Sequence, residues 1–435
     1  MGQYKVSVII PVYNAENFLD ESINSVLNQT LDDIELICVN DGSKDNSLEI
    51  LKNFASQDSR VKIINQKNGG CGAARNKALD NANGKYIYFF DPDDYISPYT
   101  LEELYDNAIS NDSDFVIFKI ASFYDGQPID YSAPGFEFEK IFKDVDFNNF
   151  TFSYKDIKRH VLLSSFAPWT KFYKKEFLDK YDDFRFHTDV AFDDVPFHVK
   201  SMLRASKISY VPNFFYYYRL SNQNSVNNTA SNAPDILKIV NFVEDFLKNN
   251  GFYNEFKEEF ILFKITQLSL YIKSSQSEDY FQLVKSNIAN LDFYNTDVPS
   301  SIEKKINALK YYHAVINSNS IEEYNQNLKN IDFLHNNNQK IKEVNIYENN
   351  FDINEYIKLE IFKLENELEK IIYRSNDFNE DYFSEDIEYY ENLIDINKRL
   401  YRENMVLKEK IDFLNEKNRY LENKKSFLSR VFKKF

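Results

Sequence analysis

Aspartates in three short clusters are the side chains of this sequence best suited to catalysis. Asp41 begins a DGS sequence, DPDD occupies residues 91–94, and Asp193 and Asp194 are adjacent. Apolar stretches that predict buried strands lie directly before the first two clusters. Carboxylates at the ends of parallel strands can hold a divalent metal together with a nucleotide diphosphate. The third cluster offers a general base.

The DPDD sequence predicts a metal site. Asp91 and Asp93 place two carboxylates within reach of one hard cation, and Mg²⁺ or Mn²⁺ is commonly shared between carboxylates and substrate phosphates. A helix cap or turn is the structural alternative, because Asp and Pro both favour turns. The apolar residues 86–90 before it and the other acidic clusters favour the metal site.

Two further segments offer groups to a nucleotide. The Asp41 carboxylate can accept the imide N–H of a uracil while Tyr13 stacks nearby, although a plain turn also explains the DGS sequence. Residues 69–76 form a glycine-rich turn into a helix, whose N–H groups can bind a phosphate. Arg75 can add positive charge there, and a helix-surface arginine is an equally good interpretation. The glycine spacing is a poor match to a dinucleotide-binding loop.

The remaining candidates lie further along the chain. Asp193 or Asp194 can deprotonate an attacking hydroxyl, and a solvated helix start is the structural alternative for this pair. Trp169 and Lys171 are candidates for an acceptor site, although Trp169 fits core packing as well. The five histidines show no metal-ligand spacing.

An alternation of strands and helices must position these residues. The apolar patterns predict strands at 6–10, 34–39, 61–64, 86–90 and 115–120, and helices at 17–27, 47–54, 73–82 and 98–109. Ser43 or Asp45 is the expected cap of the second helix. This order implies an α/β fold with a mainly parallel sheet and right-handed crossovers. The polar sequences after the first four strands should therefore gather at one sheet edge, where ligands bind.

Length, charge and cysteine content exclude several classes of function. The chain has 435 residues, enough for two or three domains, and its net charge of -16 would repel nucleic acid. Cys38 and Cys71 have no CxxC partner, which fits a reducing compartment without structural zinc. The start of the chain lacks a signal-peptide pattern, and no apolar run reaches the roughly 18 residues of a membrane span. We expect a cytoplasmic protein.

Glycine and proline divide the chain into a turn-rich front and a helical back. Eight of the nine glycines lie at or before Gly135, and the last proline is Pro299. We expect an α/β domain over 1–228, a helical accessory region over 229–345, and a helical tail over 346–435.

The tail carries a heptad pattern. Leucines recur every seven residues from Leu393 to Leu428, with several asparagines at the intervening a positions. This predicts a parallel two-stranded coiled coil through 393–428, hence a homodimer, although the helix could instead pack on its own domain. Residues 429–435 interleave basic and apolar side chains, which suits weak peripheral contact with an anionic membrane, strengthened by pairing.

Taken in order, the motifs resemble those of family 2 glycosyltransferases with the GT-A fold. The resemblance covers residues 4–226. It rests on VIIPVYN at 8–14, VNDGSKD at 39–45, NGG at 68–70, ARN at 74–76, DPDD at 91–94, WTKFY at 169–173, FDD at 192–194, and YYYR at 216–219 with Ser225. The family usually has a small residue in place of Pro92 and often Glu in place of Asp193.

The resemblance implies a role for each matched residue. Those on the nucleotide side would be Pro11, Tyr13, Asn14 and Asp41. Asp91 would approach the ribose or diphosphate, Asp93 would bind Mn²⁺ or Mg²⁺, and Asp94 would support the metal or contact the sugar. Asp194 would be the base, and Arg75 and the metal would offset the charge of the departing diphosphate.

The implied reaction is inverting transfer of a sugar from a nucleotide diphosphate, by resemblance a UDP-sugar. The acceptor would be a glycan or lipid-linked molecule at the inner membrane face, in cell-surface polysaccharide or glycoconjugate synthesis. A sugar nucleotidyltransferase is the enzymatic alternative, and it would require a loop rich in glycine and in arginine or lysine after the first strand. Residues 11–14, which follow that strand here, contain no glycine, arginine or lysine. The other alternative is an inactive GT-A scaffold that organises a glycan-assembly complex through its coiled coil. The full set of acidic residues argues against it.

Overall fold

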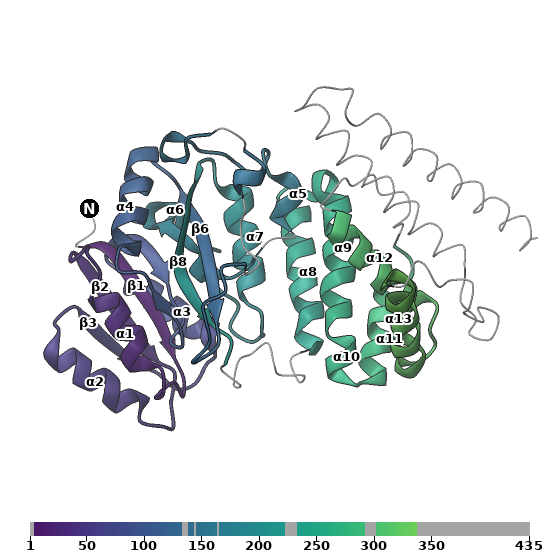
Figure 1. Cartoon of the computed structure of the whole chain (residues 1–435), viewed down its shortest axis with the longest axis horizontal. Coiled ribbons are helices and arrows are strands. Elements are labelled where there is room, and N and C mark those ends of the chain that lie inside the picture. The colour runs from purple at the N-terminus through teal and green to yellow at the C-terminus, as the bar shows by residue number, and fades with distance from the viewer. Residues whose placement is uncertain are drawn as a thin grey trace, which may run out of the picture. The chain divides into compact units, whose positions relative to one another are not determined.

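The computed structural model describes residues 4–132, 138–142, 145–162, 165–221, 233–291 and 302–336 (Figure 1). The chain divides into two compact units. The first comprises Met1–Gln276 with Asp292–Val298, and the second Ser277–Leu291 with Pro299–Phe435. The predicted coiled coil at 393–428 and the basic end at 429–435 lie outside the described residues and stay predictions.

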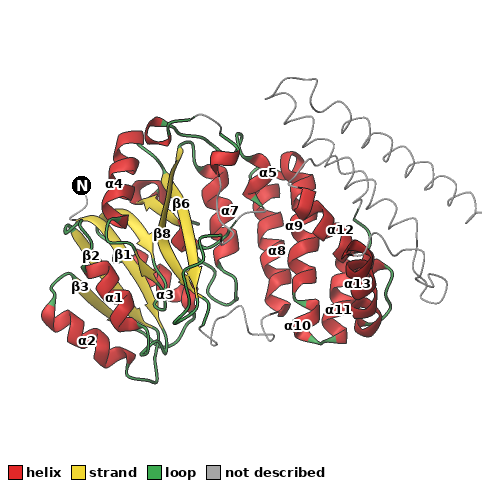
Figure 2. Ribbon diagram, viewed as in Figure 1, coloured by secondary structure: helices red, strands yellow, loops and turns green. Residues whose placement is uncertain are grey.

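A mixed sheet forms the centre of the first unit (Figure 2). Among the described residues it has eight strands in the order β3-β2-β1-β4-β7-β6-β8-β5. Their bounds are β1 Tyr4–Val12, β2 Ile34–Asn40, β3 Val61–Asn65, β4 Gly84–Phe89, β5 Tyr95–Ile96, β6 Phe115–Phe123, β7 Lys171–Lys174 and β8 Ile208–Arg219. Strands β1 to β4 pair in parallel, as predicted.

The second half of the sheet departs from the parallel pattern. Strand β7 runs antiparallel between β4 and β6, and β5 pairs antiparallel with β8, whereas β6 and β8 are parallel. The four residues of β7 carry lysine at both ends, so their sequence gives no strand signal. This insertion brings the chain after residue 170 beside β4 and the DPDD sequence.

Helices cover both faces of the sheet. Helices α1 Leu19–Leu27, α2 Ser47–Gln57 and α4 Thr100–Asn111 share one apolar core with Val6, Val8 and Ile10 of β1. The opposite face carries α3 Cys71–Leu79, α6 Lys175–Asp179 and α7 Asp194–Arg204, and there the Phe89 ring of β4 meets the Phe197 ring of α7. The alternation of β1 and β4 side chains thus builds two cores.

Two of the predicted helices begin at a different residue than expected. The helix expected at 98–109 begins at Thr100, and the one expected at 73–82 begins at Cys71. Before α2, the Asp45 carboxylate accepts a hydrogen bond from the Ser47 N–H at 3.0 Å. Cys38 is buried in β2, whereas Cys71 is exposed, and both are free thiols.

The rest of the described chain is mainly helical, as expected. The first unit also contains α5 Lys158–Val161, α8 Ala233–Asn249, α9 Tyr253–Leu270 and α10 Ile272–Ser275. The second contains α11 Glu278–Ile288, α12 Ile302–Ile316 and α13 Ile321–Asn336. Within the described ranges, no helix combines the length and apolarity that a bilayer crossing requires.

Candidate active site

The Asp41 carboxylate organises the turn that leads into α3. Its Oδ1 accepts hydrogen bonds from the Gly69 N–H and the Gln66 side chain, both at 2.8 Å, and its Oδ2 accepts from the Gly70 N–H at 2.9 Å. Gly42 has a φ of +73°, and a methyl group there would lie 2.9 Å from the Asn68 nitrogen, so only glycine fits. Asp41 therefore joins the loops after β2 and β3.

The loop after β1 is tied to the same region. Asn14, with a φ of +50°, donates its N–H to the Ser43 hydroxyl at 3.1 Å and accepts from the Lys44 N–H at 2.8 Å. Tyr13 is 46% exposed, so its ring is available to stack on a base. Pro11 is buried in β1 opposite Val39, so it shapes the strand end without presenting a surface to a ligand.

Arg75 brings the second and third acidic clusters together. Its guanidinium pairs with Asp91 at 2.8 Å and lies 3.8 Å from an oxygen of Asp193. The arginine is buried, and its Nε has no hydrogen-bond partner. Arg75 is thus no helix-surface residue: it neutralises carboxylates from the end of β4 and the start of α7.

The paired aspartates occupy an unusual turn at the start of α7. Phe192, directly before them, has a φ of +62°, which is rare for a bulky side chain and marks a strained backbone. Asp193 Oδ2 is buried without a hydrogen-bond partner, and burial raises the pKa of Asp193 to about 7 against the opposing effect of Arg75. Burial also raises the pKa of the half-buried Asp194. A carboxyl with a raised pKa suits general base catalysis near neutral pH.

Gly72 lets α3 approach these aspartates closely. A methyl group at Gly72 would overlap the His187 carbonyl oxygen and lie 2.6 Å from Asp193 Oδ2. Any larger residue would push the chain before α7 away from Arg75. No pattern in the sequence singled out this glycine from its neighbours at 69 and 70.

Asp94 turns away from the site that Asp91 faces. It is buried, its Oδ2 accepts a hydrogen bond from the Tyr216 hydroxyl, and its Oδ1 accepts from the Arg219 N–H at 2.7 Å. With both oxygens engaged inside the protein, Asp94 holds the DPDD turn in place. This placement corrects the expectation that Asp94 contacts the donor sugar.

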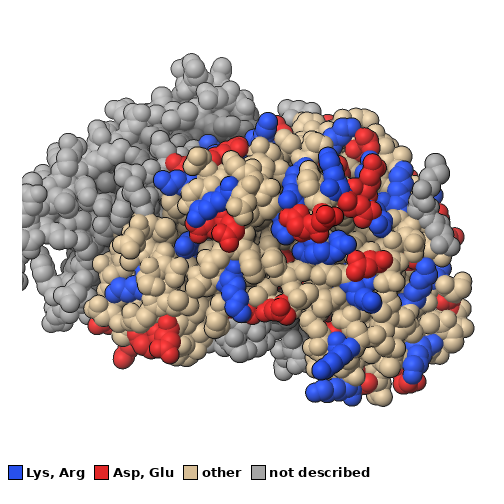
Figure 3. Space-filling view, turned by 180° about the vertical axis from the view of Figure 1, so that it is seen from behind, with Lys and Arg blue, Asp and Glu red and all other residues tan. Residues whose placement is uncertain are grey.

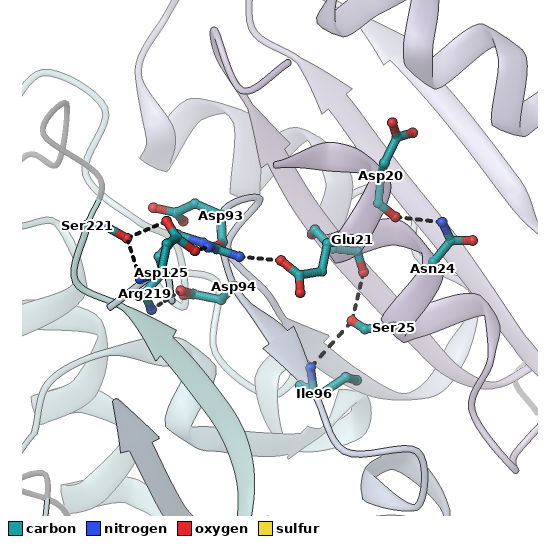
Figure 4. Close-up of polar contacts among 11 residues, drawn as sticks. Asp20, Glu21, Asn24, Ser25, Asp93, Asp94, Ile96, Asp125, Arg219 and Ser221 are labelled. Carbon is teal, nitrogen blue, oxygen red and sulfur yellow. Dashed lines mark hydrogen bonds and ion pairs between the residues drawn. The ribbon is translucent and has the colours of Figure 1, made fainter. Parts of the chain in front are cut away.

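Arg219 fixes the same turn from β8 (Figure 4). Its Nε donates to the Asp93 carbonyl oxygen at 2.7 Å, and its terminal nitrogens pair with Glu21 and Asp125. The backbone of Asp93 is therefore held by a buried guanidinium. Arg219 is the last residue of the YYYR motif, whose sequence alone does not indicate this role.

The candidate metal ligands are Asp91 and Asp93. Both side chains are partly exposed at the carboxyl end of β4, where carboxylate oxygens can reach a hard cation. Across the described parts of the chain, no group of three or more His, Cys, Asp or Glu side chains is arranged to hold a metal alone. The residues fit an ion that takes its other ligands from a diphosphate and water.

Trp169 and Lys171 lie inside the protein. The Trp169 ring stacks on Tyr216 with a centroid distance of 4.3 Å and on Tyr218 at 5.3 Å. Lys171 is fully buried, and its ammonium donates to the Ala167 carbonyl and the Thr170 hydroxyl, each at 2.9 Å. Burial lowers the pKa of Lys171 to about 7. Contrary to expectation, Lys171 presents no surface to an acceptor, so we assign it a positioning role.

On the face drawn in Figure 3, lysine and arginine side chains alternate with aspartate and glutamate.

Comparisons with known proteins agree with these motifs. The family described as "Glycosyl transferase family 2" matches residues 7–182. The cholesterol galactosyltransferase of Borreliella burgdorferi is 33% identical over 264 residues, which cover 58% of this chain and 70% of that protein. The poly(ribitol-phosphate) beta-glucosyltransferase of Bacillus spizizenii is 35% identical over 219 residues, covering 49% of this chain and 32% of that protein.

A solved structure, S. aureus TarS 1-349 in complex with UDP, is 25% identical and covers 74% of this chain and 91% of that one. The TM-score of this match is 0.43. The extent of the match to the Borreliella protein, together with the parallel β1–β4 core and its loops, decides the assignment. The chain belongs to glycosyl transferase family 2 and has its GT-A fold.

Proposed function

We propose that this glycosyltransferase is a metal-dependent, inverting enzyme that uses a nucleotide diphosphate sugar, by family resemblance a UDP-sugar. The observation that carries the proposal is the Arg75 bridge between Asp91 and Asp193, because it gathers acidic residues from distant parts of the chain at one sheet edge. The raised pKa of Asp194 supports its role as the base.

The reaction is a single displacement at the anomeric carbon. Asp194 takes the proton from an acceptor hydroxyl while that oxygen forms a bond to the anomeric carbon from one side. The bond from this carbon to the phosphate oxygen breaks on the opposite side, and the diphosphate leaves with the electron pair. One base is enough, because this route needs no covalent glycosyl intermediate.

The DPDD turn would stabilise the departing diphosphate through a bound metal ion. Asp91 and Asp93 would hold Mn²⁺ or Mg²⁺, which offsets the negative charge of the departing diphosphate. Asp94, Tyr216 and Arg219 keep this turn in position. Tyr13 would stack on the base of the nucleotide, and its exposure supports that role.

The acceptor is proposed to be a glycan or lipid-linked molecule of the cell surface. The names of the two relatives support this class, because one acts on cholesterol and the other on poly(ribitol-phosphate). We place the enzyme in the cytoplasm at the inner membrane face, paired through 393–428 and touching anionic lipid through 429–435. Liposome binding that survives deletion of 429–435 would refute the membrane contact.

Hydrolysis of donor sugars tests the catalytic proposal. UDP-glucose and UDP-galactose are incubated with Mn²⁺ and the wild type, and released UDP is measured. We expect Asp93→Ala, Asp194→Asn and removal of Mn²⁺ with EDTA each to lower the rate by about 10²-fold or more. Asp106→Asn, at an exposed position of α4, is the control that should keep the wild-type rate.

The outcomes separate the alternatives. Hydrolysis that is insensitive to both the Asp93 and Asp194 changes would overturn the site. A folded wild type that neither hydrolyses nor binds either donor would favour the inactive scaffold.

A further inference from the structure

Helix α8 contacts the loop that leads to the paired aspartates. We call residues 187–193 the Asp193 loop. The Ala191 N–H in this loop donates to Asp235 Oδ2, in the first turn of α8, at 3.0 Å. The His187 ring stacks on the Phe242 ring of α8 with a centroid distance of 3.9 Å and an angle of 5°. One helix therefore contacts this loop at two points, His187 and Ala191.

The end of α9 contacts the same loop beside the proposed base. Tyr271 directly follows α9, and its ring lies 5.1 Å from the Phe192 ring. Burial raises the pKa of Tyr271 to about 12, and the negative charge of Asp194 acts in the same direction. The geometric link of Tyr271 to the paired aspartates is its ring contact with Phe192, the residue directly before them.

Helix α3 meets the Asp193 loop with a second set of contacts. The Asn76 side chain exchanges two hydrogen bonds with the Phe186 backbone, at 2.8 and 2.9 Å, directly before the loop. Gly72 meets the loop at His187 and Asp193. The left-handed backbone of Phe192 must be held by such surroundings, because it is unfavourable for this side chain. The contacts at Phe192 and Ala191 come from Tyr271 and Asp235.

We propose that α8 and α9 are parts of the active centre, and that Asp235 and Tyr271 are positioning residues that aim Asp193 and Asp194 at the donor. The helical region that follows the sheet would thus have a catalytic task in addition to any accessory one. This inference rests on the proposed function, because it assigns the same base.

Variants at the two positions test the inference through UDP-sugar hydrolysis with Mn²⁺. Asp235→Ala removes the acceptor of the Ala191 N–H, and Tyr271→Ala removes the ring beside Phe192. We expect each to lower kcat about tenfold or more while the KM for the donor stays unchanged, since a small misplacement of a reacting group is costly. Asp235→Asn keeps an oxygen acceptor and Tyr271→Phe keeps the ring, so both should recover most of the rate.

Two matched controls come from the same helices. Asp245→Ala changes an exposed aspartate of α8, and Tyr253→Phe changes a tyrosine at the opposite end of α9. Both should behave as wild type. Wild-type kcat in Asp235→Ala and Tyr271→Ala would overturn the inference, as would a loss that the conservative variants fail to rescue. If Asp194→Asn hydrolyses donor normally, the proposed function fails instead.

Hydrogen exchange gives a readout that does not need turnover. Peptides that cover the Asp193 loop should exchange faster in Asp235→Ala than in wild type or Asp245→Ala, because the Ala191 amide loses its acceptor. Unchanged protection would overturn the inference even if no donor is hydrolysed.

Discussion

Substituting Gly72 with alanine tests how closely α3 must approach the Asp193 loop. The added methyl group would overlap the His187 carbonyl oxygen and lie 2.6 Å from Asp193 Oδ2. An ordinary carbon–oxygen contact is about 3.3 Å, so the loop must withdraw by about 0.7 Å or more. Gly72 lies in the first turn of α3, whose backbone cannot yield without breaking its own hydrogen bonds.

This withdrawal of the loop should lower both the free energy of unfolding and the catalytic rate. Overpacking by one methyl group typically costs about 1–3 kcal/mol, which we expect as the loss in free energy of unfolding. The displaced Asp193 and Asp194 should also lower catalysis, and a misplacement of about 1 Å can cost about 10²-fold in rate. Gly72→Ala should therefore lose far more activity than its stability loss explains at a temperature where it remains folded.

Gly84→Ala is the matched control. A methyl group there would overlap the Ser7 nitrogen and lie 2.7 Å from the Ser7 hydroxyl, at the end of β4 opposite the DPDD turn. Urea unfolding should give similar stability losses for both variants, whereas UDP-sugar hydrolysis should fall only in Gly72→Ala. Equal activity in the two variants would refute the idea that Gly72 is needed for the position of the aspartates.

The two remaining predictions concern charge. Asp193 keeps its proton up to about pH 7 when folded, whereas an unfolded aspartate releases it near 3.8, so the native state binds more protons between these values. The free energy of unfolding should therefore fall as pH rises through this window, and urea unfolding of Asp193→Asn should show a smaller fall. An unchanged slope would contradict the burial of this carboxyl. Arg75→Lys cannot reproduce the planar contacts to both Asp91 and Asp193, so its donor hydrolysis should drop about tenfold or more. Wild-type rates in this variant would show that the Arg75 bridge is dispensable.

Local sequence patterns were enough to predict the part of the fold formed by β1 to β4 and the loops that follow them. The strands β1 to β4 are mainly apolar and each is followed by a polar sequence, so both the strands and their ligand edge could be located. Asp41 and Asp91 follow β2 and β4 as these patterns predict, and Arg75 lies in α3, whereas their roles in binding a nucleotide stay predictions. The contact of Arg75 with Asp193 could not be predicted, because only the fold brings these two distant residues together.

What the sequence could not reveal depends on contacts between distant residues. Asp94 belongs to the same motif as Asp91, yet its carboxylate is taken by Tyr216 and Arg219 of β8. Lys171 looks like a polar residue offered to a ligand, but β7 places it inside the protein. In each case the residue type indicates a charged group, and only the strand order shows which way it faces.

The charges around Arg75 support the proposal that a cation binds with the donor. Asp91, Asp193 and Asp194 surround the Arg75 guanidinium, and the buried Lys171 also acts on Asp194. Burial is the main cause of the raised pKa of Asp193 and Asp194, and neighbouring carboxylates raise both pKa values further against the opposing effect of Arg75. A diphosphate would add further negative charge, so its binding is unfavourable unless positive charge arrives with it. Asp91 and Asp93 are the partly exposed carboxylates at the end of β4, and the proposed divalent ion, shared between them and the donor, would offset this negative charge.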